Sequence, residues 1–122
     1  MSIAQLQALI KKAQDEIDIC NNIIIPLINK LIDSVSGVVF NLGNAANSLS
    51  DGIVINGVPQ GLDVAEERKE VLQNYINNLS SLSSAVSSYV RKLYNDISNW
   101  NAQIQRILEE QRRQEELEKK RK

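Results

Sequence analysis

The most constraining feature of this chain is the spacing of its apolar residues, which recur at alternating gaps of four and three in both halves. This spacing keeps one face of a helix apolar and is typical of helices that pack against other helices. The rows are Leu6, Ile10, Ala13, Ile17, Cys20, Ile24, Leu27 and Leu31, then Leu72, Tyr75, Leu79, Leu82, Val86, Tyr89 and Leu93. Because a turn-rich stretch separates the rows, the sequence predicts an all-α fold, an elongated, coiled-coil-like antiparallel two-helix hairpin.

The pattern divides a single domain, residues 1–122, into four segments. We expect helix 1 at residues 3–50, a tip loop at 51–62, helix 2 at 63–108 and a charged tail at 109–122. Pro26 lacks an N–H and its ring crowds the carbonyl of Asn22, so helix 1 is expected to kink near Pro26. Asp63 followed by Glu66 has the form of an N-cap with an acid three residues later, which predicts the start of helix 2.

The expected tip loop is too apolar for a simple flexible linker. Three β-branched residues, Ile53 to Ile55, precede Asn56-Gly57, a pair that favours a tight turn. The sequence therefore predicts a compact tip. Its apolar side chains either fold back over the helix ends or form a surface that a partner covers.

Two features disturb the regular helices. In helix 2 the gaps before and after Leu93 are both four residues, which predicts a stutter at Leu93 and Ile97 that locally unwinds a supercoil. In helix 1, Gly37 and Gly43 each cost up to about 1 kcal/mol relative to alanine. The two glycines either allow another helix to approach closely or simply weaken the helix.

Downstream of Pro26, helix 1 is apolar over a wider arc than one antiparallel helix can cover. We therefore expect the hairpin to complete a bundle with a helical partner or with a second copy of itself. The predicted partner-binding residues are Ile25, Ile28, Ile32, Val35, Val39, Leu42 and Ala46.

Composition argues against catalysis and against binding of metals, cofactors or nucleic acid. The chain has no histidine, which removes the commonest general base and metal ligand. Cys20 is the single cysteine and lies in the apolar row, where a thiol usually packs as a small hydrophobe. No phosphate-binding loop or metal-ligand spacing is present in the sequence, and a net charge of -1 disfavours nucleic acid. We therefore expect no enzyme activity and no cofactor.

No membrane insertion is expected. The first residues lack the basic and apolar regions of a secretory signal peptide. The apolar run Ile23 to Ile28 is bracketed by polar residues and falls short of the roughly 20 residues that a membrane span needs. The expected location is the cytoplasm, or co-export with a partner without a cleaved signal.

The segment after Leu108 is almost entirely Glu, Gln, Arg and Lys, with acids placed four residues before bases. It is predicted to be a solvated helix that extends past the start of helix 1. It either serves as a targeting tail or is a frayed charged end. The targeting residues would be Arg112, Arg113, Lys119, Lys120, Arg121 and Lys122.

The two apolar rows, the glycine-rich tip from Asp51 to Gly61 and the charged extension together resemble the small helical proteins of the type VII secretion system. That group includes the WXG100 proteins and the helical partners of LXG-domain toxins. The turn carries Asn56-Gly57-Val58 in place of Trp-x-Gly, so the LXG-associated partners are the better match. The resemblance implies a non-enzymatic adaptor that binds the helical N-terminal region of an LXG-type toxin, with or without a second small helical protein, and promotes its export. The alternative is a self-associating structural protein, such as a phage or cytoskeletal component.

Overall fold

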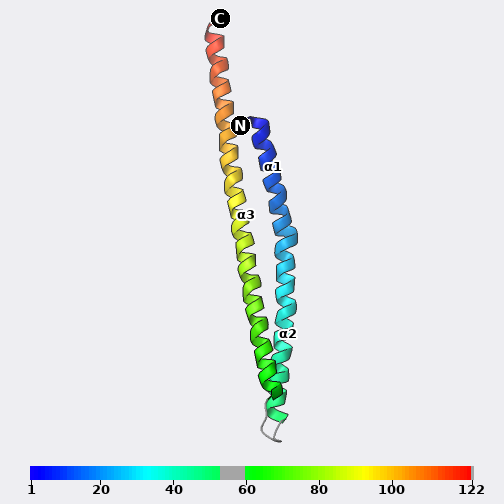
Figure 1. The fold of residues 1–122 in the computed structure, drawn as a ribbon. Coiled ribbons are helices and arrows are strands. Elements are labelled where there is room, and N and C mark those ends of the chain that lie inside the picture. The colour runs from blue at the N-terminus through cyan, green and yellow to red at the C-terminus, as the bar shows by residue number, and fades with distance from the viewer. Residues whose placement is uncertain (53–59, 122) are drawn as a thin grey trace. The chain divides into compact units, whose positions relative to one another are not determined.

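The computed structural model describes the backbone of residues 1–52 and 60–121, and side chains within residues 1–48 and 65–121. Over these residues the chain is helical and contains no strand (Figure 1). The elements are α1 (Ile3–Ile19), the π-helix η1 (Cys20–Ile24), α2 (Ile25–Gly52) and α3 (Gln60–Arg121). The predicted all-α class is confirmed.

The start of α1 is fixed by a capping box that the sequence analysis did not identify. The Ser2 hydroxyl accepts a hydrogen bond from the Gln5 backbone N–H at 3.2 Å, and the Gln5 side chain accepts one from the Ser2 N–H at 2.9 Å. Two backbone donors that the first helical turn leaves free are thereby satisfied.

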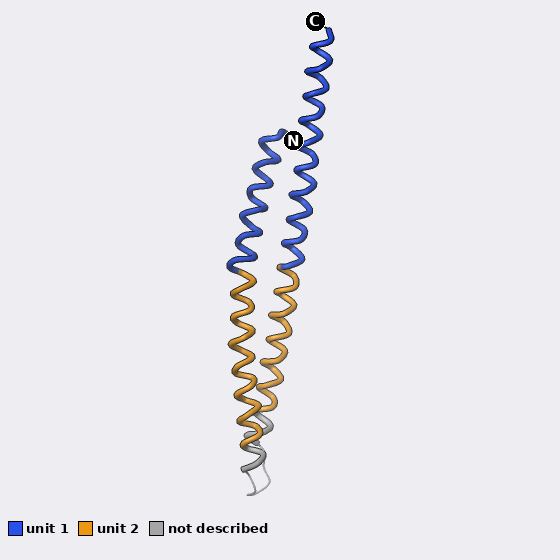
Figure 2. The backbone as a smooth tube through the Cα atoms, turned by 180° about the vertical axis from the view of Figure 1, so that it is seen from behind, with its two compact units in different colours: residues 1–23, 87–122 blue, residues 24–86 orange. Residues whose placement is uncertain are grey.

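The chain divides into two compact units, shown in Figure 2. In unit 1, residues 1–23 and 87–122, α1 lies beside the C-terminal part of α3 (Figures 1 and 2). In unit 2, residues 24–86, α2 lies beside the N-terminal part of α3. The buried apolar residues of unit 1 are Leu6, Ala13, Ile17, Cys20, Val90, Leu93 and Ile104, and those of unit 2 are Ile28, Ala46, Ala65 and Leu79.

The interruption predicted near Pro26 takes the form of the π-helical turn η1, which ends two residues before the proline. Pro26 cannot donate the backbone hydrogen bond that an α-helix requires there. A π turn takes one more residue per hydrogen bond than an α turn, so it changes which residues face inward. Beyond η1 the buried residue is Ile28, 4% exposed, whereas Leu27 is 56% exposed. The prediction that Leu27 and Leu31 continue the inner row is therefore wrong.

The inner row of α3 also differs from the predicted one. It keeps gaps of four and three without interruption, so the stutter predicted at Leu93 and Ile97 is absent. Tyr75, Leu82 and Tyr89, predicted to face inward, are exposed. The buried and half-buried residues of this row are Ala65, Lys69, Leu72, Ile76, Leu79, Ser83, Val86, Val90, Leu93, Ile97, Trp100, Ile104 and Ile107.

The helices extend into both ends of the predicted tip loop. Because α2 continues to Gly52 and α3 begins at Gln60, Asp63 lies inside a helix, and its predicted N-cap role is wrong. The predicted turn at Asn56-Gly57 and the question of what covers the tip lie outside the described residues.

Candidate interaction surface

The residues predicted to bind a partner form the inner row of α2 within unit 2. Ile28 and Ala46 are buried, and the other five are half-buried. Their partial exposure leaves only the borders of this row accessible to another molecule. Those five are Ile25, Ile32, Val35, Val39 and Leu42.

A different set of apolar side chains in unit 2 is exposed. Seen along the axis of each helix, these side chains lie about 60 to 130° away from the inner row. The direction of this rotation is the same in α2 and in α3. We call them the apolar face; they are Leu27, Leu31 and Val38 of α2 and Val71, Tyr75 and Leu82 of α3.

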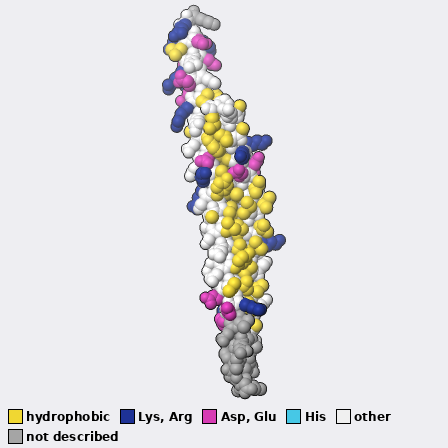
Figure 3. Space-filling model, in the orientation of Figure 1, with side chains coloured by type: hydrophobic (Ala, Val, Ile, Leu, Met, Phe, Trp, Pro, Cys, Tyr) yellow, Lys and Arg dark blue, Asp and Glu magenta, His cyan; other side chains and the backbone are white. Residues whose placement is uncertain are grey.

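The two helices contribute to a common surface. Val38 and Leu42 of α2 line one groove together with Val71 and Leu72 of α3, so the exposed edges of the helices meet there. In Figure 3 hydrophobic side chains form a continuous band along the described part of unit 2. The groove is bordered at one end by Glu67 and Arg68.

Much of this surface belongs to two stretches of the chain without ionisable side chains. Residues 34–48 of α2 and 71–86 of α3 include no Asp, Glu, Lys or Arg. In the described part of unit 2, Lys30 and Asp33 lie between Leu27 and Val38 in the sequence of α2, and the mixed-charge segment 66–70 of α3 borders the groove. Contacts made by the apolar face therefore depend on burial of apolar area rather than on ion pairs.

The helical glycines have open space around them. A Cβ atom built at Gly37 or at Gly43 meets nothing within 4 Å outside the adjoining helix backbone. Neither glycine is therefore needed for a close approach of helices within this chain. Their role in an approach by another chain stays a prediction.

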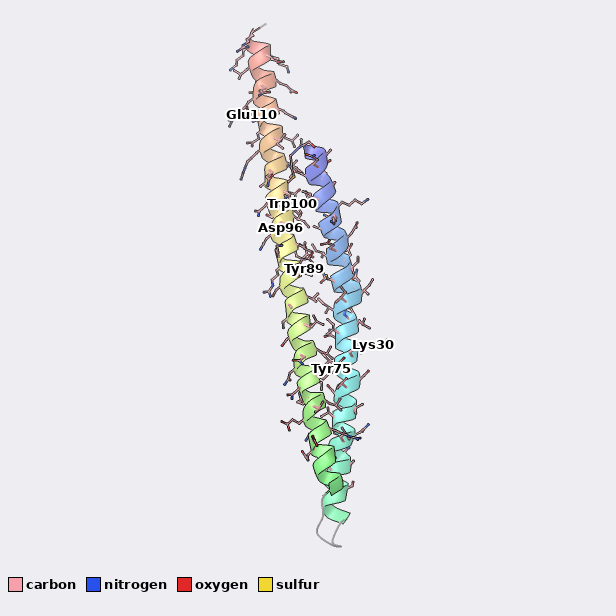
Figure 4. The ribbon with its side chains drawn as sticks, viewed as in Figure 1. Lys30, Tyr75, Tyr89, Asp96, Trp100 and Glu110 are labelled. Atoms are coloured by element: carbon pink, nitrogen blue, oxygen red, sulfur yellow. The ribbon has the colours of Figure 1, made fainter. Side chains whose placement is uncertain are left out.

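Within the described residues of unit 1, one side-chain hydrogen bond links the two helices. The Tyr89 hydroxyl of α3 donates a hydrogen bond of 2.7 Å to a Glu16 carboxylate oxygen on α1 (Figure 4). This hydrogen bond is the main cause that raises the pKa of Tyr89, because ionisation of the phenol would break it and place two negative charges together. This hydrogen bond links α1 to α3.

The predicted targeting tail continues α3 as a helix. Residues 109–121 are all exposed, including Arg112, Arg113, Lys119, Lys120 and Arg121. Lys122 lies outside the described residues. The tail is therefore accessible to another molecule along its described length, as the sequence predicted.

Two further properties concern metal binding and membranes. Within the described residues, no group of three or more His, Cys, Asp or Glu side chains is placed to hold a metal ion. The helical stretch Ile3–Ser48 is long and apolar enough to cross a membrane, a criterion that soluble core helices and N-terminal signal sequences also meet.

Comparisons of the chain with protein-family models, curated proteins and solved structures find no match. The chemistry of the protein's own surface is therefore what indicates its function.

Sequence reasoning assigned Leu27, Leu31, Tyr75 and Leu82 to the inner rows, and so missed the apolar face. A usable signal was present in α3, where an uninterrupted pattern of gaps from Ala65 to Ile107 requires no stutter. That pattern places Ser83 in the inner row, and a serine there made the row harder to recognise.

Proposed function

We propose that this chain is a non-enzymatic helical binding protein whose apolar face is covered by helices of another protein. The observation that carries this proposal is the apolar face itself, six large side chains that are each about half exposed. Together they leave roughly 500 Å² of apolar side chain in water, which matches the largest patches of ordinary monomers and is often functional. The absence of ionisable side chains from residues 34–48 and 71–86 favours a partner that is also apolar at that part of the contact.

The proposed architecture is an antiparallel two-helix hairpin that a partner completes into a bundle. The groove lined by Val38 and Val71 supports side-by-side packing in unit 2, and the Tyr89–Glu16 hydrogen bond supports it in unit 1.

The proposed partner is the helical N-terminal region of an LXG-type toxin, and the proposed role is to promote its export by a type VII secretion system. This assignment rests on the resemblance of the helical rows and charged extension to the partners of such toxins. The apolar face would hold the toxin, and the basic residues of the tail, Arg112 to Lys122, would engage the secretion machinery. Binding and targeting would then be separable.

Co-expression with the N-terminal region of an LXG-type toxin encoded in the same genome tests the binding step. We expect the two proteins to co-purify, and Leu82→Glu to weaken the complex at least tenfold, as loss of a central apolar contact does. Phe40→Glu is the matched control, because Phe40 is 69% exposed on α2 but lies outside the apolar face. Failure to co-purify with any such toxin region of that genome would exclude the toxin assignment.

Export tests the targeting step. A chain lacking residues 109–122 should still bind the toxin but should reduce the amount of toxin in the culture supernatant. Intracellular complex is quantified alongside. Undiminished export would remove the tail from the mechanism, and loss of the complex would place the tail in the binding surface.

A further inference from the structure

We propose that, without a foreign partner, the apolar face pairs with the same face of a second copy, forming a two-fold symmetric homodimer in which the two copies of unit 2 run antiparallel. This inference rests on the apolar face used in the proposed function, but it concerns a different occupant. The resulting assembly is a four-helix arrangement built from two copies of α2 and two copies of the N-terminal part of α3.

The first argument is the regular spacing of the face. Leu31 and Val38 are seven residues apart on α2, and Tyr75 and Leu82 are seven apart on α3. A seven-residue spacing is two turns of a supercoiled helix, so such an edge accepts another helix of the same period. A second copy of the chain supplies two helices, α2 and α3, that carry apolar residues at this seven-residue spacing.

The second argument is the continuity of the face. With α2 and α3 antiparallel, as proposed above, residues from the two helices alternate along a patch about 20 Å long. The order along the patch is Leu27, Leu82, Leu31, Tyr75, Val38 and Val71. Neither helix alone provides an uninterrupted surface, so the complementary occupant is a pair of helices rather than a single one.

The third argument is charge. A two-fold axis brings residues near it against their own copies, which is unfavourable for like charges. The centre of the face lies between Ser34 and Asn78, neither of which is ionisable, and Asp33 is the nearest charged neighbour of Ser34 in the sequence. The antiparallel arrangement also places the two copies of segment 66–70, which carries three Glu beside Arg68 and Lys69, at opposite ends of the contact, whereas a parallel dimer would place both at the same end.

The area is sufficient for a specific contact. The six side chains contribute roughly 500 Å² per copy, and flanking Ser, Asn and Ala residues bring the contact towards the about 800 Å² per partner of a standard interface. An interface of this size supports a stable dimer when its centre is apolar and free of unpaired charges.

Sedimentation of the full chain from low to high micromolar concentration tests self-association. We expect a reversible monomer–dimer equilibrium, with Leu82→Glu and Val71→Glu each raising the dimer dissociation constant at least tenfold. Phe40→Glu, the matched exposed substitution, should change it less than about threefold. Because all three side chains are exposed, helicity by circular dichroism should be unchanged.

Thiol crosslinking tests the arrangement. In a Cys20→Ala background, Ser34→Cys and Asn78→Cys should each form dimers with a short bis-maleimide, because both positions are exposed next to the proposed axis. Asn44→Cys, exposed on the opposite side of α2, is the control and should not crosslink. A parallel dimer would instead crosslink Ser34→Cys only when mixed with Asn78→Cys.

A wild-type chain that stays monomeric, a dimer that the face variants leave intact, or the parallel crosslinking pattern would each overturn the inference. The proposed function fails separately. If the chain is monomeric but Leu82→Glu abolishes toxin binding, the second copy is the wrong occupant and the toxin remains the right one.

Discussion

Alanine substitution of two adjacent residues, Ile28 and Leu27, tests whether the π-helical turn resets the inner row. Each substitution removes the same number of side-chain carbons from α2. Ile28 is 4% exposed and Leu27 is 56% exposed. The sequence pattern placed Leu27 in the inner row and placed Ile28 in the wider apolar arc downstream of Pro26.

The expected magnitudes follow from burial. Removing three carbons from a buried site costs about 0.8 kcal/mol for each, and the residual cavity raises the total to about 2.5–4 kcal/mol for Ile28→Ala. Leu27 keeps less than half of its side chain out of water, so Leu27→Ala should cost about 1 kcal/mol or less. The helix propensity of alanine offsets only a few tenths of a kcal/mol in either variant.

Urea denaturation followed by circular dichroism, at low protein concentration so that self-association contributes little, gives both free energies of unfolding. We expect Ile28→Ala to lose at least twice as much stability as Leu27→Ala, and its melting temperature to fall by about 10 °C. Equal losses, or a larger loss for Leu27→Ala, would refute the shift of register at η1 and restore the uninterrupted row.

Three further outcomes are expected. Gly37→Ala should stabilise the chain by up to about 1 kcal/mol in thermal unfolding, because a Cβ at Gly37 meets nothing within 4 Å; destabilisation would contradict the open space. The pKa of Tyr89 is raised, so its hydrogen bond to Glu16 should stabilise the fold fully below about pH 10 and progressively less as pH rises through the raised pKa. The difference in unfolding free energy between wild type and Tyr89→Phe should therefore shrink at alkaline pH. A difference that stays constant would show that the Tyr89–Glu16 hydrogen bond does not stabilise the fold. Removal of residues 109–122 should shift the melting temperature by less than about 2 °C, since residues 109–121 are exposed; a larger shift would mean that the tail packs against the fold.

The fold class was predictable because helix periodicity is a local property of the sequence. From Leu6 to Cys20 the predicted row and the buried row coincide, and η1 lies close to the proline that predicted an interruption. Beyond η1 the sequence offered two rows, one through Leu27 and one through Ile28, and the extra residue in the π turn, which depends on how the backbone accommodates the missing donor of Pro26, decides between them. The row through Leu27 was wrong for that reason.

In α3 the difficulty was competition between two neighbouring rows. Tyr75, Leu82 and Tyr89 are larger than Ile76, Ser83 and Val90, and Ser83 is polar, so side-chain size and the serine favour the first row for the interior. The structure instead buries or half-buries the second row.

The presence of two apolar rows on each helix links the fold to the proposed function. A helix that packs only against its own hairpin partner needs one apolar row, and its remaining surface is usually charged. In unit 2 each helix carries a second row beside the first, and residues 34–48 and 71–86 supply no charge to keep that second row in water. Such a helix is chemically suited to the interior of a bundle with more than two helices. Leu82 and Tyr75 lie outward because the inner row of α3 passes through Ile76, Leu79 and Ser83, and the outward position makes them available to a second pair of helices. The same choice of row that defeated the sequence prediction therefore creates the surface on which both proposals depend.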